Sequence, residues 1–356
     1  MFRHRVVLSL ITLITLSALV VIVTSLVCWH EKAQFADEPS MKIVSQVADH
    51  EFPEDKERAS LLGHVGKVFC LATTPDGRKL FSGGEDGSIK LWNLSTGREI
   101  STLQRDASAI FSLATTSDGL EVASGSVDGM VRLWDAATRK EVGSFSASTK
   151  IVRCVTFNPT NTLLATASED GMIKVWDRST WKERTSLLHS RFPCSAVSFS
   201  PDGKTVASGS TDRTVRTWSV STREEITHLT TIDLLIRSIT FSPDGKALAV
   251  SGGSAGGPGG VKVLDMPTGR ELVSLTGHTQ AVTSVAFTPD GRHLASADAG
   301  GIVKVWDMNT RTEAISLHAH PATVFSVKFV GEGRQLATAS ADGLIKLWDL
   351  SLSSRE

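Results

Sequence analysis

Three residue types that can form a hydrolase triad lie close together near the start of the chain: His64, Ser82 and Asp86. In a serine hydrolase the histidine takes the proton of the serine while the acid orients the histidine. That chemistry requires one exposed nucleophile beside its base. The same offsets of 18 and 22 residues recur much later in the chain, in His320, Thr338 and Asp342. A reactive centre is normally built once, so this repetition favours a structural role over catalysis.

A tryptophan ends each of these sets and belongs to a longer repeat. The six tryptophans of the repeat are spaced by 42, 42, 42, 88 and 42 residues, at Trp92, Trp134, Trp176, Trp218, Trp306 and Trp348. The interval of 88 residues contains a further copy, GGVKVLD, in which Leu264 takes the place of the tryptophan. The chain therefore contains seven units of about 42 residues.

Each unit carries a turn sequence and short apolar segments. TPDGRK (74–79) and SPDGKT (200–205) are examples of the turn, and in the third unit Asn161 replaces the glycine. Glycine and asparagine accept the positive φ that a tight turn needs. Segments such as KVFCLA, KLFSG, SIKLW and REISTL lie between the turns, and none has a helical period. The pattern predicts four short strands per unit.

These units resemble the WD-repeat family over about residues 57–350. The shared features are Gly-His at 63–64 and 277–278, Ala-His at 319–320, and Trp-Asp at 134–135, 176–177, 306–307 and 348–349. The fold of that family is a β-propeller with one four-stranded sheet per blade around a central channel. The resemblance implies an all-β, seven-bladed propeller.

The chain also contains a segment that could close the ring. An outer-strand pattern precedes each new unit, as in EISTL (99–103) and EVGSF (141–145), and ERASL (57–61) supplies a copy ahead of the first blade. We expect residues 56–62 to pair with the strand that ends at Trp348, so that no sheet edge stays open. The propeller would then comprise residues 56–356.

The resemblance also assigns a role to the triad-like sets. In the family, these side chains form a buried hydrogen-bonded chain with the tryptophan indole, which stabilises the blade. The predicted members are His64, Ser82, Asp86 and Trp92 in blade 1, and His320, Thr338, Asp342 and Trp348 in blade 7. At these offsets blade 6 has Gly300 in place of the acid, and blades 2, 3 and 4 have no histidine. The sequence thus predicts complete networks only in blades 1 and 7.

Net charge and cysteine spacing give no sign of a nucleic-acid partner, a disulfide framework or a metal site. The net charge is −1 and the pI is about 6.8, so nothing indicates general attraction to nucleic acid. Cys28 lies in the N-terminal segment, and Cys70, Cys154 and Cys194 fall in different units. Neither a disulfide framework nor a metal-ligand spacing is therefore predicted. We expect no cofactor.

Three other features have a structural alternative to a binding role. The glycine-rich segment 251–262 lacks the frame of a phosphate-binding loop and is better explained as a widened turn. His318 and His320 form an H-x-H pair, but His320 is already assigned to a network. A cation stands two residues before each tryptophan or its leucine substitute, and strand position alone explains this ring. The cations are Lys90, Arg132, Lys174, Arg216, Lys262, Lys304 and Lys346.

The N-terminal segment predicts a membrane anchor. Residues 6–29 contain no charge, and a helix of this length can span a bilayer. Two arginines precede the segment, which favours an N-terminus inside and an extracytoplasmic propeller. The predicted division is a signal-anchor at 1–30 and an acidic flexible linker at 31–55. The alternative is a cleaved signal and a secreted protein.

The residues that differ between the units predict a docking surface. In the WD-repeat family, the start of the inner strand and the position before the tight-turn acid face the top rim, where partners usually dock. The inner-strand set is Phe69, Phe111, Arg153, Ser195, Arg237, Thr283 and Phe325. Its three phenylalanines fall on consecutive blades and are flanked by Arg153 and Lys67, with Glu85 and Glu169 at the turns. Grouped aromatics and arginine are typical of interaction hot spots. Alternatively, the rings fill the channel mouth.

The leading hypothesis is therefore a non-catalytic, membrane-tethered scaffold that docks a protein or peptide on its top rim. The alternative is a small-ligand receptor or enzyme centred on the channel. That alternative needs His, Asp or Glu side chains that converge on the channel. None remains once the repeats are accounted for.

Overall fold

The computed structural model describes residues 56–105, 108–229, 233–254, 257–266 and 268–352, which form 28 strands. These strands make seven antiparallel four-stranded sheets, here called blades. Blades 1 to 3 are β2 (Val68–Thr73), β3 (Lys79–Gly84), β4 (Ser88–Asn93), β5 (Arg98–Arg105); β6 (Ile110–Thr115), β7 (Glu121–Ser126), β8 (Met130–Asp135), β9 (Glu141–Ser146); and β10 (Val152–Phe157), β11 (Leu163–Ser168), β12 (Met172–Asp177), β13 (Glu183–Leu188).

The remaining blades follow the same order from inner to outer strand. Blades 4 to 6 are β14 (Cys194–Phe199), β15 (Thr205–Ser210), β16 (Val215–Ser219), β17 (Glu225–Leu229); β18 (Ile236–Phe241), β19 (Ala247–Gly253), β20 (Gly259–Asp265), β21 (Glu271–Leu275); and β22 (Val282–Phe287), β23 (His293–Asp298), β24 (Ile302–Asp307), β25 (Thr312–His318). Blade 7 is β26 (Val324–Val330), β27 (Gln335–Ser340), β28 (Ile345–Asp349) and β1 (Lys56–Leu61).

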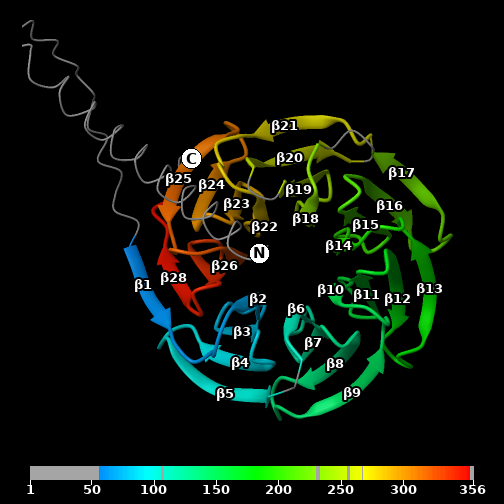
Figure 1. Cartoon of the computed structure of the whole chain (residues 1–356), viewed down its shortest axis with the longest axis horizontal. Helices are drawn as coiled ribbons and strands as arrows, with labels where there is room; N and C mark the ends of the chain where they lie inside the picture. The colour runs from blue at the N-terminus through cyan, green and yellow to red at the C-terminus, as the bar shows by residue number, and fades with distance from the viewer. Residues whose placement is uncertain (1–55, 106–107, 230–232, 255–256, 267, 353–356) are drawn as a thin grey trace, which may run out of the picture. The chain divides into compact units, whose positions relative to one another are not determined.

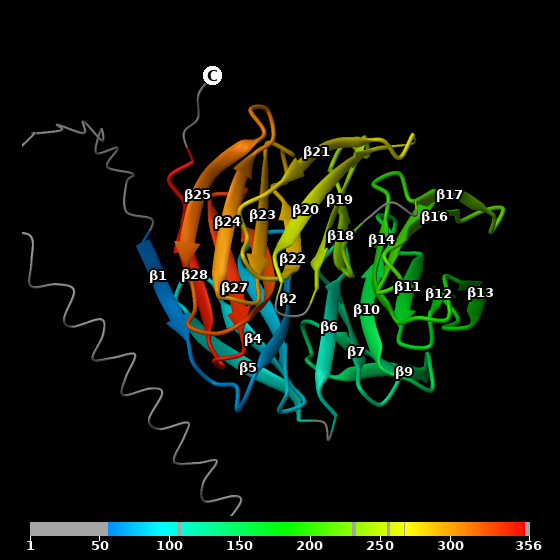
Figure 2. The same cartoon turned by 45° about the horizontal axis from the view of Figure 1, so that its top comes forward.

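The blades stand side by side in a ring. Figures 1 and 2 show the first strand of each sheet nearest the central channel and the fourth on the outside. Each blade packs face to face on the next, because a sheet this small cannot bury its apolar faces alone. Seven core clusters lie between neighbouring blades, and the tryptophan of each repeat is buried in one of them, as is Leu264. This is the seven-bladed propeller that the repeats predict.

Strand β1 closes the ring at blade 7. It pairs antiparallel with β28, from Lys56 opposite Asp349 to Leu61 opposite Ile345. The Leu61 side chain is only 1% exposed and packs in the core between blades 7 and 1. On the surface of this pair, the Lys346 ammonium lies 2.7 Å from the Glu57 carboxylate. The two ends of the propeller thus share one sheet, and β28 has no open edge.

The predicted turns connect inner strands to their neighbours. Gly77 and Gly203 have φ of 64° and 69°, and Asn161 takes the same conformation at 55°. The glycine-rich segment 251–262 forms a longer β19–β20 hairpin in blade 5, whose strands pair out to Gly253 opposite Gly259.

The predicted anchor at 1–30 and linker at 31–55 lie outside the described residues. Within the described part of the chain, no helix is long and apolar enough to cross a membrane.

Candidate functional site

The triad-like residues of blades 1 and 7 form buried hydrogen-bonded chains. In blade 1, Nδ1 of His64 lies 3.1 Å from Asp86 and Nε2 lies 2.7 Å from the Ser82 hydroxyl, which also accepts the Trp92 indole N–H at 2.8 Å. The carboxylate can only accept, so Nδ1 carries the proton and Nε2 accepts from the serine. Ser82 is fully buried, so no substrate can reach it. This geometry is that of a buried network that holds the strands of the blade together, and not of a catalytic centre.

Blade 7 repeats the arrangement. His320 contacts Asp342 at 2.8 Å and Thr338 at 2.7 Å, and the Trp348 indole donates to the same threonine at 3.1 Å.

The charges in the blade 1 network follow from burial and hydrogen bonding. Burial opposes ionisation of Asp86, but N–H donors from Val65 and Ser88, the Ser88 hydroxyl and His64 outweigh it and lower the pKa to about 2. Burial also lowers the pKa of His64. At neutral pH the histidine is therefore neutral and the aspartate ionised.

Blade 6 also has a complete network, so the prediction of complete networks only in blades 1 and 7 is wrong. The acid comes from Asp298, two residues before Gly300, and lies 2.8 Å from Nδ1 of His278. Nε2 of the same ring lies 2.7 Å from Ser296, which accepts the Trp306 indole N–H at 2.8 Å. Asp298 is buried, and its other oxygen accepts the backbone N–H groups of residues 300 and 302 at 2.9 Å.

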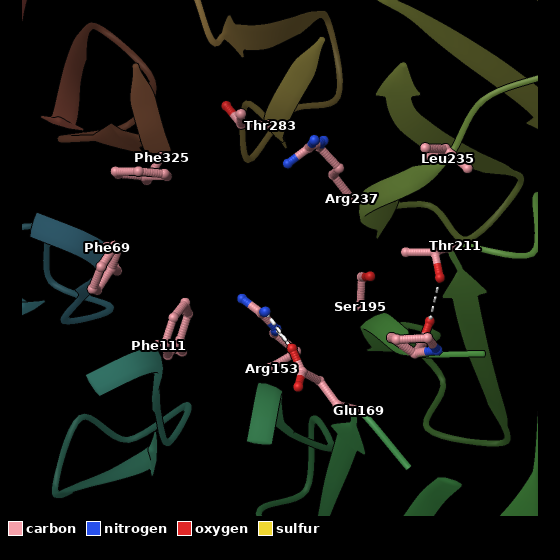
Figure 3. A pocket seen from close by; sticks show the side chains of 11 residues that line it. Phe69, Phe111, Arg153, Glu169, Ser195, Thr211, Leu235, Arg237, Thr283 and Phe325 are labelled. Atoms are coloured by element: carbon pink, nitrogen blue, oxygen red, sulfur yellow. Dashed lines mark hydrogen bonds and ion pairs between the residues drawn. The ribbon is translucent and has the colours of Figure 1, made fainter. Parts of the chain in front are cut away.

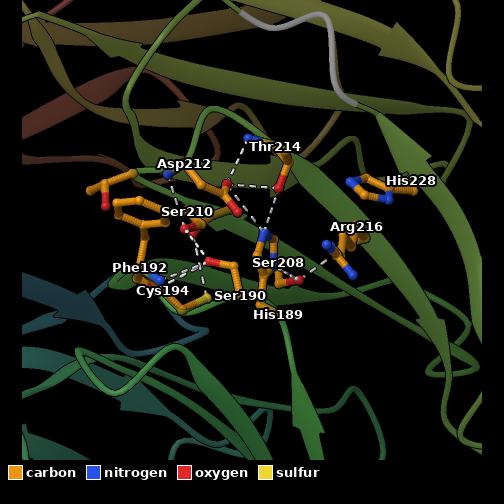
Figure 4. Close-up of polar contacts among 12 residues, drawn as sticks. His189, Ser190, Phe192, Cys194, Ser208, Ser210, Asp212, Thr214, Arg216 and His228 are labelled. Carbon is orange, nitrogen blue, oxygen red and sulfur yellow. Dashed lines mark hydrogen bonds and ion pairs between the residues drawn. The ribbon is translucent and has the colours of Figure 1, made fainter.

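The prediction that blade 4 has no network histidine is also wrong, because His189 takes that role (Figure 4). His189 lies 19 residues before Ser208 rather than 18, and its ring is reversed: Nδ1 lies 2.8 Å from Ser208 and Nε2 2.8 Å from Thr214. Thr214 donates to the Asp212 carboxylate at 2.7 Å, so it accepts from Nε2, and Nδ1 accepts from Ser208. Burial lowers the pKa of His189 to about 4. A threonine thus relays the contact with the acid.

The seven cations that precede the repeat tryptophans, or Leu264, lie on the third strand of each blade and are all paired with acids. Each lies 2.7–3.3 Å from a carboxylate, in the pairs Lys90–Glu99, Arg132–Asp128, Lys174–Glu183, Arg216–Glu225, Lys262–Glu271, Lys304–Glu313 and Lys346–Glu57.

The residues at the start of the inner strands surround one pocket. The pocket has a volume of about 350 Å³ and lies at the end of the channel where these strands begin; we call it the channel mouth (Figure 3). All seven predicted inner-strand residues line it, together with Glu169: Phe69, Phe111, Arg153, Ser195, Arg237, Thr283 and Phe325.

A β-bulge in every inner strand directs these side chains. In blade 1, Val68 pairs with Gly84 and Cys70 with Gly83, so Phe69 has no partner in the ladder. The same shift occurs at the equivalent residue of all seven blades. A bulge breaks the alternation of side chains. As a result, both Phe69 and Cys70 line the channel.

The three phenylalanines form a packed arc on one side of the channel mouth, here called the aromatic arc. Phe69 stacks on Phe111 with centroids 4.6 Å apart, and Phe325 meets Phe69 edge to face at 5.0 Å. The rings are half-buried rather than fully exposed. They cover one side of the opening and leave the pocket beside them.

The charged candidates divide into paired and unpaired groups. Arg153 stacks over Phe111, 4.5 Å from its centroid, and its Nε donates to Glu169 at 2.8 Å. Lys67 and Glu85 pair with each other at 3.6 Å on the rim of blade 1, outside the residues that line the pocket. Arg237 is exposed, and Figure 3 shows its guanidinium pointing into the opening.

Below the mouth the channel is lined by small polar side chains and one lysine. Cys70 and Cys154 occupy the level where four other blades have serine and blade 4 has alanine. Burial raises the pKa of both thiols, which keeps them protonated and unreactive. Lys328 lies one level deeper, and sequence reasoning missed it. An alignment of the inner strands would have shown it, because the other blades have alanine, serine or threonine there.

The described residues contain no group of three or more His, Cys, Asp or Glu side chains that could hold a metal ion. The H-x-H pair is therefore not part of such a cluster within these residues.

Comparisons with known proteins assign the family. Residues 67–256, more than half of the chain, match the family described as the IFT122 first β-propeller, and residues 269–307 and 311–349 match the WD domain, G-beta repeat. The chain belongs to the WD40-repeat β-propeller family. WD40 propellers are generally non-catalytic scaffolds that bind other proteins.

Individual WD40 relatives match only about one repeat each. The chain is 40% identical to the small ribosomal subunit protein RACK1z of Arabidopsis thaliana over 52 residues, 15% of this chain and 16% of the relative. It is 47% identical to a ribosome biogenesis protein BOP1 homolog of Caenorhabditis elegans over 45 residues, 12% of this chain and 7% of the relative. It is 41% identical to human THO complex subunit 6 over 44 residues, 12% and 13% of the two chains. The matches thus cover less than a fifth of each relative.

Proposed function

We propose that this WD40 protein is a non-catalytic docking module that binds a peptide segment of a partner protein at the channel mouth. The observation that carries the proposal is the aromatic arc, with an exposed, inward-pointing Arg237 across the opening from it. Aromatic and arginine side chains supply most of the binding energy in many interfaces. A pocket of about 350 Å³ admits a few side chains rather than a folded domain.

The buried networks support a non-catalytic role. Every triad-like set in blades 1, 4, 6 and 7 has its serine or threonine hydroxyl buried and hydrogen-bonded to a histidine and a tryptophan. The alternative, a channel-centred receptor or enzyme, is not favoured by any histidine or acid in the channel lining that the structure describes below the mouth.

A matched pair of triple variants tests the docking proposal. Phe69→Ser, Phe111→Ser and Phe325→Ser together should remove partners that a native extract delivers to the wild-type chain. Val142→Ser, Ile226→Ser and Leu272→Ser remove three exposed apolar side chains near the start of outer strands, at the opposite rim, and should leave the bound set unchanged. An identical bound set for both triple variants would remove the channel mouth as the docking site.

We also propose that residues 6–29 tether the propeller to a membrane, with the N-terminus inside and the propeller on the extracytoplasmic side. The support is the uncharged stretch of 24 residues preceded by Arg3 and Arg5. The full chain should remain in the membrane pellet after a carbonate wash, and external protease should reach the propeller. A chain without residues 1–30 should be released. Release of the full chain, or its secretion after cleavage, would contradict the tether.

A further inference from the structure

Lys328 is the one lysine among the residues that line the channel below the aromatic arc. It lies on β26, two residues beyond Ser326 and three beyond Phe325 of the arc, so about 10 Å along the strand from the mouth. Ala72, Thr156 and Ser198 are examples of what other blades place at this level. Among the described residues, no hydrogen bond or ion pair joins the Lys328 amine to a partner. The Lys328 amine thus has no carboxylate partner among the described residues.

The lining as a whole carries excess positive charge. Its charged side chains are Arg153, Arg237, Lys328 and Glu169, and the described lining contains no other acid. Arg153 and Glu169 neutralise each other. Arg237 at the mouth and the Lys328 amine below it are therefore left without an acidic partner in the described lining, in a space where charges interact more strongly than in bulk water.

The surroundings of Lys328 make its charge costly. Burial by the channel walls lowers the pKa of the amine. An anion that entered the channel would favour the protonated form and recover part of that cost.

We propose that the docked segment is an acidic peptide, whose Asp or Glu carboxylate enters the channel between Arg237 and Lys328 while a neighbouring apolar side chain packs on the aromatic arc. This inference rests on the proposed docking function and specifies the chemistry of its partner.

The arrangement of the mouth fits such a ligand. The aromatic arc belongs to blades 7, 1 and 2, whereas Arg237 belongs to blade 5 and faces the arc across the opening (Figure 3). One side of the site is thus apolar and the other is cationic. Arg237 and Lys328 line the same cavity, of about 240 Å³, and the lysine stem is flexible enough to turn toward the mouth. A peptide with adjacent acidic and apolar residues satisfies both sides at once.

Selection from a random dodecapeptide library on the full chain, kept in mild detergent, tests this proposal. The selected peptides should be enriched in Asp or Glu next to an apolar residue. One synthetic selected peptide and its Glu→Gln or Asp→Asn form are then compared by fluorescence anisotropy, and the neutral form should bind at least tenfold more weakly.

Variants of the protein locate the carboxylate. Arg237→Ala and Lys328→Met should each weaken binding of the acidic peptide at least tenfold, whereas Lys328→Arg should keep most of it. Arg292→Ala, which removes an exposed arginine from a turn at the opposite rim, is the matched control and should have no effect. Circular dichroism melting verifies that each variant is folded.

The outcomes separate the two proposals. If neutral or basic peptides are selected and the triple phenylalanine variant abolishes their binding, the acidic-ligand inference fails and the docking function stands. The acidic-ligand inference also fails if Arg237→Ala and Lys328→Met change the affinity less than twofold. If selected peptides bind the triple phenylalanine variant as well as the wild type, or if no peptide is enriched, the proposed docking site itself fails.

Discussion

At the scale of single residues, the buried His189 links the stability of the propeller to pH. His189 has no exposed side-chain surface, and its Nε2 lies 3.7 Å from Asp212, beyond hydrogen-bond distance. Asp212 favours the protonated ring, but burial outweighs it and lowers the pKa of His189 to about 4. Its neutral form makes one donor and one acceptor contact, and protonation would break the acceptor contact with Ser208.

This predicts a loss of stability on mild acidification. An unfolded histidine takes up its proton near pH 6.5, whereas folded His189 does so only near pH 4, so its contribution is present above pH 6.5 and is lost between these values. The pKa shift of His189 corresponds to about 3 kcal/mol in the free energy of unfolding. Urea unfolding across this range should show the decline, and His189→Gln should be less stable at pH 7 with a shallower dependence. Equal slopes for both proteins would contradict this role.

Several important residues could not be found by counting offsets. His189 stands one position earlier than the rule allows, and Asp298 stands two positions before the expected acid. A side chain can compensate for a difference of one or two residues in position, because the network requires only that the atoms come within hydrogen-bond distance. The pairing of Arg153 with Glu169 and the isolation of Lys328 likewise depend on which side chains meet in space.

At the scale of elements, a blade can form the same hydrogen-bonded network with its acid at a different sequence position. In blade 6, Asp298→Ala would leave the His278 ring and two backbone N–H groups without an acceptor. We expect a loss of about 2–4 kcal/mol. Asp298→Ser combined with Gly300→Asp recreates the serine and aspartate positions of blade 7 and should recover most of it. Thermal melting compares the variants.

Asp128→Ala in blade 2 is the control for this experiment. Asp128 bonds to Ser126, Arg132 and a backbone N–H but to no histidine, and its side chain is partly exposed. Asp128→Ala should therefore lower the free energy of unfolding clearly less than Asp298→Ala does. A double variant of blade 6 no more stable than Asp298→Ala would show that the two arrangements are not equivalent.

The inner strands show what an element-level pattern can and cannot predict. The variable residues at their starts were predicted to share a rim, and the structure places all seven around the channel mouth. The repeated bulge was not predicted, because the sequence of an inner strand such as VFCLAT alternates in the same way with or without one. Only the pairing register reveals it.

At the scale of the whole molecule, the 42-residue period was sufficient to predict seven blades, since each unit must bury its faces on its neighbours. Closure by residues 57–61 could also be predicted, because one outer strand was missing after Trp348 and one was in excess before the first repeat.

Removal of the closing strand should therefore weaken the entire ring. A chain that begins at residue 63 loses β1 and the buried Leu61, and β28 gains an open edge. We expect a loss of about 3–5 kcal/mol, which lowers the melting temperature by roughly 10 °C in a domain of this size. A chain that begins at residue 50 retains the strand and is the control. Equal melting temperatures would show that β1 does not stabilise the ring.

The most direct test of the docking account places a photoreactive benzoylphenylalanine at Phe111, in the channel mouth, or at Val142, on the opposite rim, of the full chain in its native cells. The account predicts a cross-linked partner only from position 111, whose yield falls with Arg237→Ala and whose linked peptide contains Asp or Glu. Equal cross-linking from both positions, or cross-linking from position 142 alone, would contradict it.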